Sequence, residues 1–201
     1  MNRIAIASAA ILATGLSACV AGPEPVQVTR FVAPAAPAQL GQGTIFVESA
    51  EGQAQDGLAL MPYKTAVASE LRRLGYTETD RGSARQIARI SVDRFVQTTG
   101  GRRSPVSVGV GGGTGSYGSG LGLGIGINLG GGERDKLGAE LAVTIREANS
   151  QTNLWEGRAD FRVADNSALA QPQANAQTLA AALFREFPGN NGETIEVEVT
   201  E

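Results

Sequence analysis

The chain has 201 residues, of which 42% are apolar, 18% charged and only 5% aromatic, and its formal charge is −3. This length is typical of one compact domain, and the negative charge argues against nucleic-acid binding driven by net electrostatics. The single cysteine and the absence of histidine exclude an internal disulfide, a zinc site of Cys/His type and any Ser-His or Cys-His nucleophile pair.

Residues 1–18 predict a secretory signal peptide. Arg3 precedes the uncharged stretch IAIASAAILATGLSA, which is too short and too rich in small residues for a membrane-spanning helix. The sequence Leu16-Ser17-Ala18-Cys19 resembles the bacterial lipobox. In signals of that kind the cysteine is acylated and the preceding peptide is removed. Two or more acyl chains hold a protein stably on a membrane, so we expect lipidation at Cys19; an ordinary signal with a chance cysteine is the alternative.

Val20 follows the cysteine, where the sorting rule of Gram-negative lipoproteins has Asp for retention in the inner membrane. By resemblance to that rule, we expect a lipid-anchored protein at the periplasmic face of the outer membrane. Residues 19–42 hold Cys19 and four prolines, and this composition predicts a tether that is semi-rigid near its prolines. Within it, residues 26–32 alternate well enough to form a short edge strand. The folded domain is expected over residues 43–201.

The first half of that domain predicts a strand, a helix and a second strand. Residues 44–47 form a short aliphatic run. Pro62 suits the first turn of a helix whose apolar residues recur at helical spacing as far as Leu74, and Gly75 ends it. Alternation of apolar and polar residues then predicts a strand over residues 88–96.

The second half predicts a hairpin, a helix and a final strand. Residues 141–146 and 155–163 alternate on either side of a polar turn, which indicates a strand pair with one buried face. Trp155 and Phe161 share that face, and we expect them to pack with Leu71 and Leu183. A helix over residues 174–187 ends at Pro188-Gly189, and a strand follows over residues 194–199. We therefore expect an α+β fold: a largely antiparallel sheet with two helices packed on one face, plus a Gly-rich β-hairpin.

The hairpin corresponds to residues 106–132, where 13 of the 24 residues from Gly109 to Gly132 are glycine. Aliphatic residues alternate with glycine in both halves, which is strand chemistry around a turn. Three interpretations are open. The hairpin belongs to the domain's own sheet, with the glycine face closely packed; it is a poorly ordered insertion; or it is membrane-active. The last needs an oligomeric barrel, since a lone hairpin leaves backbone groups unpaired in lipid.

The charged residues predict surface pairing more strongly than chemistry. Residues 72–103 contain eight Arg and only three acidic residues. One interpretation is a solvated surface whose opposite charges partly pair. The other is an Arg-lined face that binds anionic headgroups or glycan phosphates, with Arg102 and Arg103 best placed. A pair of carboxylates for glycan hydrolysis would have to come from four residues whose spacing does not bring them together: Asp93, Glu140, Glu147 and Glu156. The sequence thus predicts no catalytic, metal-binding or cofactor-binding residues.

Several segments carry a resemblance to a known family. They are Pro62-Tyr63 with Leu74-Gly75-Tyr76, the run from Arg103 into the glycine repeat, Leu154-Trp155-Glu156-Gly157, and the turn from Phe187 to Thr194. With these the chain resembles the lipoprotein family called domain of unknown function 4136. The resemblance implies an envelope lipoprotein with an α+β domain, and implies no reaction, ligand or catalytic residue.

Together these observations favour a non-enzymatic binding or scaffolding module. Its expected partners are the membrane, through the anchor, and an envelope protein or glycan, with no nucleic acid. An oligomeric membrane-active lipoprotein and a glycan-active enzyme are the alternatives.

Overall fold

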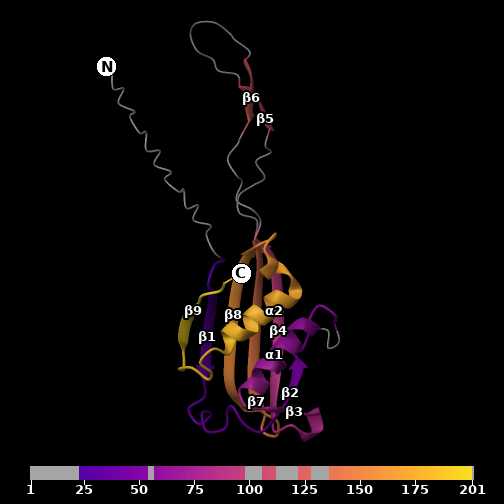
Figure 1. Cartoon of the computed structure of the whole chain (residues 1–201), viewed down its shortest axis with the longest axis vertical. Coiled ribbons are helices and arrows are strands. Elements are labelled where there is room, and N and C mark those ends of the chain that lie inside the picture. The colour runs from indigo at the N-terminus through magenta and orange to yellow at the C-terminus, as the bar shows by residue number, and fades with distance from the viewer. Residues whose placement is uncertain (1–22, 54–56, 98–105, 112–121, 128–135, 201) are drawn as a thin grey trace, which may run out of the picture.

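The computed structural model describes residues 23–53, 57–97, 106–111, 122–127 and 136–200. Its body is a seven-stranded sheet with the order β3-β2-β4-β7-β8-β1-β9, and both helices cover one face of it (Figure 1). The helices are α1 (Met61–Arg73) and α2 (Pro172–Leu183). The strands of the sheet are β1 (Val26–Val32), β2 (Thr44–Ser49), β3 (Thr77–Glu78), β4 (Gln86–Gln97), β7 (Lys136–Glu147), β8 (Asn153–Ala164) and β9 (Glu193–Val197).

The sheet is mixed, so the prediction of a largely antiparallel sheet is wrong, although the α+β class holds. β2 runs parallel to both β3 and β4, whereas β4, β7, β8, β1 and β9 are joined by antiparallel ladders. The cause is the connection between β2 and β4. It passes through α1, and a crossover helix returns the chain to the sheet in the same direction. Alternation along a strand gives its faces but not its direction.

α1 begins and ends where its sequence predicts. Pro62 lies in its first turn, and Gly75 follows its last residues with a φ of +106°. Two features exclude a side chain at Gly75. One is its positive φ, and the other is that a Cβ there would lie 2.7 Å from the carbonyl oxygen of Gly41. The buried face of α1 is formed by Tyr63, Ala66, Val67, Ala68 and Leu71. α1 is thereby fixed over β2, with the loop before β2 held against its end.

The β7–β8 hairpin supplies the centre of the core, as predicted. Trp155, Phe161, Leu71 and Leu183 are all at most 1% exposed. The Trp155 ring stacks on Phe184 at a centroid distance of 5.4 Å and meets Phe187 at 5.2 Å. Its indole N–H donates to the carbonyl oxygen of Pro188 at 2.9 Å. Trp155 therefore packs against the end of α2, on the face that its alternation predicts.

Residues 26–40, expected within the tether, belong to the folded domain. β1 lies between β8 and β9 rather than at an edge of the sheet. Val26 and Val28 are fully buried, and further along this segment Ala36 and Leu40 enter the core. The short apolar pattern predicts the strand correctly, whereas its neighbour β9 comes from the far end of the chain and leaves no local signal.

β1 also carries a fully buried arginine, Arg30. Its guanidinium donates to the backbone carbonyls of Ala182, Leu183 and Arg185 at the end of α2. Of these carbonyls, that of Ala182 also accepts from the N–H of Arg185 at 3.3 Å. Carbonyls at the end of a helix lack the N–H partners that the helix gives the others, and a cation is favoured at the negative end of the helix dipole. The same guanidinium reaches Glu193 at the start of β9. Arg30 therefore joins β1, α2 and β9.

The remaining strands form a ladder of their own. β5 (Val106–Gly111) and β6 (Gly122–Ile127) pair antiparallel with each other and not with the seven-stranded sheet. Their register sets Val108 opposite Ile125 and Gly109 opposite Gly124. The predicted strand pair is confirmed. Of the three interpretations that the sequence leaves open, the described strands do not match the one in which the hairpin belongs to the domain's own sheet. The turn of the predicted hairpin lies outside the described residues.

Candidate functional site

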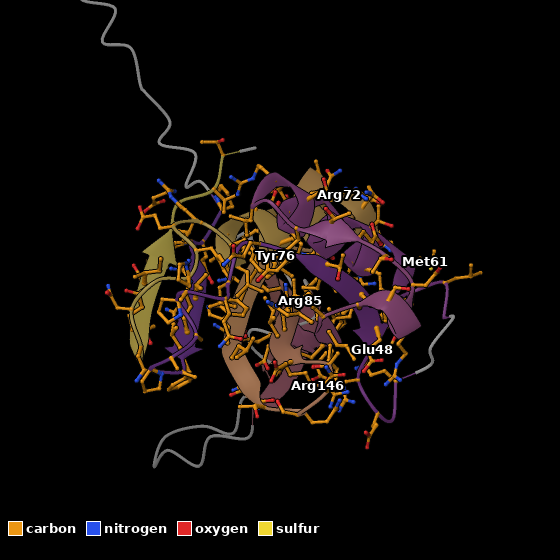
Figure 2. The ribbon with its side chains drawn as sticks, turned by 90° about the horizontal axis from the view of Figure 1, so that it is seen from below. Glu48, Met61, Arg72, Tyr76, Arg85 and Arg146 are labelled. Carbon is orange, nitrogen blue, oxygen red and sulfur yellow. The ribbon has the colours of Figure 1, made fainter. Side chains whose placement is uncertain are left out.

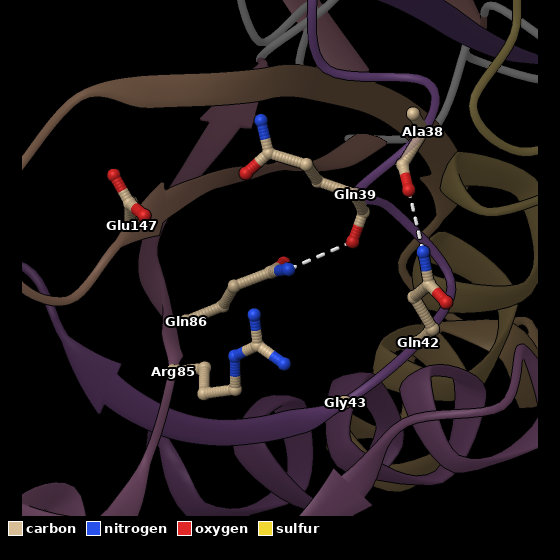
Figure 3. Close-up of a pocket in the computed structure, with 7 residues that line it drawn as sticks. All are labelled: Ala38, Gln39, Gln42, Gly43, Arg85, Gln86 and Glu147. Atoms are coloured by element: carbon tan, nitrogen blue, oxygen red, sulfur yellow. Dashed lines mark hydrogen bonds between the residues drawn. The ribbon is translucent and has the colours of Figure 1, made fainter.

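A polar pocket opens at the end of the sheet where β4 begins and β7 ends (Figure 3). It has a volume of about 210 Å³ and lies between these strand ends and the loop before β2. Gln86 and Glu147, which face each other in the β4–β7 ladder, contribute one part of its wall. The lining residues are Ala38, Gln39, Gln42, Gly43, Arg85, Gln86 and Glu147. The lining residues come from three separate segments of the chain, and five of the seven have a polar or charged side chain.

A layer of hydrogen bonds behind the pocket fixes its wall. Gln86 is 7% exposed; its amide donates to the carbonyl of Gln39 at 2.8 Å and accepts from the Tyr76 hydroxyl at 3.1 Å. Burial raises the pKa of Tyr76 to about 12, so its hydroxyl remains a donor at neutral pH. Gln42 donates to the carbonyl of Ala38, which closes the loop on itself. The Gln86 amide is therefore held in one orientation.

Two side chains of opposite charge line this pocket. The Arg85 guanidinium points into the space beside Gln86 (Figure 3). Among the described residues it has neither a hydrogen bond nor an ion pair, because only the backbone of Arg85 is engaged, with Thr44 and Ala148. The Glu147 carboxylate accepts a hydrogen bond from Ser150. The pocket thus offers a free cation, a carboxylate and an oriented amide.

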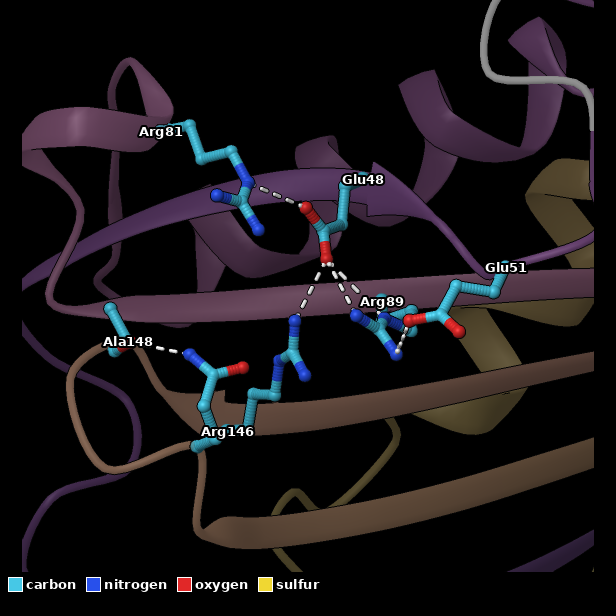
Figure 4. Close-up of polar contacts among 7 residues, drawn as sticks. Glu48, Glu51, Arg81, Arg89, Arg146 and Ala148 are labelled. Atoms are coloured by element: carbon cyan, nitrogen blue, oxygen red, sulfur yellow. Dashed lines mark hydrogen bonds and ion pairs between the residues drawn. The ribbon is translucent and has the colours of Figure 1, made fainter.

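A cluster of arginines surrounds Glu48 on the opposite side of the same sheet end (Figure 4). Glu48, on β2, is 8% exposed. One carboxylate oxygen accepts from Arg81 at 2.9 Å, and the other from Arg146 at 3.1 Å and Arg89 at 3.2 Å. The three arginines come from the 3₁₀ turn η1 (Arg81–Ser83), from β4 and from β7. This single carboxylate therefore connects β2, β4, β7 and the β3–β4 connection; Figure 2 shows Glu48, Arg85 and Arg146 from that end.

The arginines set the protonation of Glu48. Burial by itself raises the pKa of a carboxyl, but hydrogen bonds and charge from Arg81 and Arg89 outweigh burial and hold the pKa of Glu48 below its ordinary value. Arg89 also pairs with Glu51 at 3.4 Å. The Nε of Arg146 is buried without a partner among the described residues. The cluster keeps Glu48 ionised and carries an excess of positive charge.

The face of the sheet away from the helices carries a shallower depression of about 270 Å³. Phe31, which is 53% exposed, lies at its side, and small residues of β7 and β8 form its floor. Its lining comprises Thr29, Phe31, Ala142, Val143, Thr144, Glu156, Gly157 and Arg158. This face is otherwise charged, with pairs such as Arg158–Glu140 at 2.9 Å.

The basic segment identified in the sequence divides into paired and free arginines. Arg72 pairs with Glu78 at 2.8 Å and Arg73 with Glu70 at 2.6 Å, while Arg81 and Arg89 bind Glu48. Arg85 lines the pocket and its side chain has no partner in the part of the chain that the structure describes. For most of these arginines the interpretation as a paired surface holds. Arg102, Arg103 and Cys19, the site residues predicted from sequence, lie outside the described residues.

The four carboxylates weighed for hydrolysis do not form one group. Asp93 and Glu140 face each other across β4 and β7 on the exposed face. Glu156 lies further along that face, where Asn153 donates to it, and Glu147 lines the pocket at the sheet end. Within the described residues there is no set of three His, Cys, Asp or Glu side chains arranged to hold a metal ion.

Sequence reasoning missed Gln86, Glu48, Arg146 and Arg30. Only Arg30 left a signal, since it occupies a buried position in the alternation of β1 between Val28 and Val32. An arginine in the apolar phase of a strand indicates a buried, fully hydrogen-bonded cation. The others gather only through the β2–β4–β7 register, which no local pattern encodes.

The fold and these sites can now be compared with known proteins. The family described as "Domain of unknown function (DUF4136)" matches residues 35–189. The chain belongs to this family. The match includes the pocket, the arginine cluster and both helices, and it confirms the resemblance read from the sequence.

Other similarities are more distant. An uncharacterized protein of Zymomonas mobilis is 35% identical over 64 residues, which are 32% of this chain and only 24% of that relative. A PelC dodecamer from Paraburkholderia phytofirmans has a TM-score of 0.42 at 10% identity, and the match covers 79% of this chain and 94% of the PelC chain. A PDZ domain protein from Parabacteroides distasonis has a TM-score of 0.47 at 10% identity, and the match covers 87% of this chain and 39% of the PDZ domain protein's chain. None of these similarities carries an argument about function.

Proposed function

We propose that the chain is a lipid-anchored protein of the cell envelope whose domain is a non-enzymatic binding or scaffolding module at the periplasmic face of the outer membrane. The lipobox ending at Cys19 supports the anchor. The observation that supports the proposed orientation of the domain on the membrane is an ion pair near the start of the described chain. Lys136 Nζ lies 2.5 Å from Glu24 Oε1.

This ion pair joins Glu24 to one end of the sheet. Lys136 begins β7 and faces Gln97, the last residue of β4, so Glu24 lies at the end of the sheet where β4 ends and β7 begins. Glu24 is five positions after Cys19, and an extended chain over five steps spans at most about 18 Å. A lipid on Cys19 would hold this end of the sheet close to the membrane.

The pocket and the arginine cluster lie at the other end. Glu147 is eleven positions after Lys136 along β7, and at about 3.3 Å per residue these ends are roughly 36 Å apart. The anchored domain would therefore present its pocket and arginines away from the bilayer, toward partners in the periplasm. Among the described helices, none is long and apolar enough to cross a membrane.

The placement of the carboxylates favours binding over hydrolysis. Asp93 and Glu140 stand on the exposed face of the sheet rather than in a cavity, and Glu140 is engaged by Arg158. A glycosidase needs two carboxyl groups on opposite sides of one bound sugar. The pocket supplies one carboxylate, from Glu147.

Fractionation tests the anchor, and incubation with envelope material tests the activity. A Cys19→Ala chain should leave the membrane fraction, and continued sedimentation with membranes would contradict lipidation. The purified protein should co-sediment with peptidoglycan or lipopolysaccharide, or be captured with an envelope protein by crosslinking in intact cells. Release of products from either glycan would establish the rival enzymatic function.

A second candidate function is favoured by the same ion pair. Lys136, at the Glu24 end of the sheet, is the first residue of the strand that follows β6 in the chain. In the β5–β6 register aliphatic positions pair with one another, and the alternate positions are glycine or Ser107. A membrane-active hairpin needs this geometry, and closure by several copies to satisfy its edges. Native mass spectrometry of the lipidated protein tests it: a detergent-stable oligomer would support it and a monomer would exclude it.

A further inference from the structure

Two opposite charges line the polar pocket without pairing with each other. Arg85 and Glu147 are both lining residues, yet no ion pair within 4.0 Å joins them. The Arg85 guanidinium has no partner among the described residues, and a single hydroxyl, from Ser150, binds the Glu147 carboxylate. A pocket that keeps a free cation and a carboxylate apart has room between them for a molecule with the opposite arrangement of charge.

We propose that this pocket binds a small zwitterion, a molecule with one carboxylate and one ammonium group, of the size of an amino acid or a dipeptide. The ligand carboxylate would lie on Arg85, whose planar fork of donors matches a carboxylate in two hydrogen bonds. The ligand ammonium group would lie on Glu147. Gln86 contributes its oriented amide, which has a second N–H beyond the one bound to Gln39.

The size and lining of the pocket favour this class of ligand. Its volume of about 210 Å³ is below the 300–1,000 Å³ typical of pockets for drug-sized molecules. None of the seven lining residues is aromatic or a large aliphatic, so an apolar ligand would find little surface to bury. The wall is built in advance, because Tyr76 and Gln39 hold Gln86 and Gln42 closes the loop. Such preorganisation lowers the entropic cost of binding.

Calorimetric titration of the full chain in detergent tests this proposal with three matched probes. Dialanine carries both charges, propionate carries only the carboxylate, and ethylamine carries only the ammonium. Dialanine should bind at least about tenfold more tightly than either single-charge probe, since each charge-assisted hydrogen bond is worth a factor of this order. Lack of dialanine binding at 10 mM, on the order of the weakest complexes that calorimetry detects, would overturn the proposal.

Two variants assign the two ends of the ligand. Arg85→Gln should weaken dialanine and propionate alike, by at least about tenfold. Glu147→Gln should weaken dialanine and leave propionate unchanged, so that the preference for the zwitterion disappears. Arg94→Gln is the control, because Arg94 is an exposed arginine of β4, the strand that follows Arg85, and lies outside the pocket.

The outcomes are distinct from those of the proposed envelope function. Equal affinity for dialanine and propionate in the wild-type chain would overturn the zwitterion, and an Arg94→Gln loss equal to that of Arg85→Gln would overturn the site. Circular dichroism of each variant confirms folding before titration, and if Glu147→Gln fails to fold, Glu147→Asp should reduce the preference for dialanine in its place. Cys19 plays no part in this test.

Discussion

Arg30 Nη1 lies 2.9 Å from Glu193 Oε1, beneath the turn that joins α2 to β9. The arginine side chain is fully buried, whereas that of the glutamate is 20% exposed. The turn folds over this pair so closely that a Cβ on Gly189 would lie 2.2 Å from the Glu193 carboxylate. Arg30 thus closes the C-terminal segment onto β1, and this contact requires glycine at position 189 of the turn.

Replacing Arg30 with methionine should strongly destabilise the domain. The substitution keeps an unbranched side chain as far as about the position of Nε but removes the guanidinium, so the carbonyls of Leu183 and Arg185 lose the donor that Arg30 supplies. Loss of a buried hydrogen bond to a charged group costs about 1.5–3 kcal/mol, and Arg30 makes several. Urea denaturation of Arg30→Met measures the loss.

The control is Arg72→Gln, which breaks the exposed pair with Glu78. Exposed pairs contribute at most about 1 kcal/mol. An Arg30→Met chain as stable as Arg72→Gln would show that the network is dispensable.

Gly157 should tolerate no side chain. A Cβ there would lie 2.2 Å from Cη2 of Trp155 and 2.8 Å from Cδ1 of Leu183, and both neighbours are buried. Overpacking of this kind costs about 1–3 kcal/mol, so Gly157→Ala should lower the denaturation midpoint. Gly82→Ala is matched to it, with nothing within 4 Å of its Cβ, and should stay within about 0.5 kcal/mol of the wild type. Equal midpoints for the two variants would refute the packing of Trp155 on α2.

Glu48 should make stability depend on pH in the acid range. Because its pKa in the folded protein is below the ordinary value of 4.5, ionised Glu48 stabilises the folded state above that pH. This contribution is lost as the pH falls through the folded pKa. The difference in unfolding free energy between wild type and Glu48→Gln should therefore shrink below pH 4.5. A difference that stays constant from neutral pH into the acid range would contradict the role of Arg81 and Arg89.

The β5–β6 ladder should be independent of the domain's stability. The double change Gly122→Val, Gly124→Val adds side chains to a ladder that pairs with itself and not with the seven-stranded sheet. Valine also has the higher strand propensity. The unfolding free energy of the domain should change by no more than about 0.5 kcal/mol. A loss of more than about 1 kcal/mol would show that another surface packs against the glycine face.

The sequence predicts the local elements well, because their signals are local. Pro62 and Gly75 mark the ends of α1, and strict alternation marks the buried face of β8 around Trp155. The direction of β2 and the interior position of β1 were missed. Both depend on partners distant in sequence: β2 pairs with β4 across a helix, and β1 pairs with β9 across most of the chain.

The candidate site was predicted only in fragments. The sequence identifies the arginine-rich segment and names Glu147. It does not predict that Arg85 and Glu147 line one pocket, because they are 62 positions apart and only the pairing of β4 with β7 brings them together. Glu48 sits in an ordinary strand pattern, and only the fold gathers three arginines around it. Buried networks of this kind are tertiary features that residue spacing does not reveal.

Quenching by the membrane tests the arrangement of the anchored domain most directly. Gln97 and Asn149 are both exposed and lie at opposite ends of the β4–β7 ladder, so single cysteines at these positions can each carry a fluorescent label. In the lipidated protein on vesicles with brominated acyl chains, the Gln97→Cys label should be quenched and the Asn149→Cys label should not. Stronger quenching at residue 149, or equal quenching at both positions, would contradict an anchor at the Glu24–Lys136 end and a pocket that faces the periplasm.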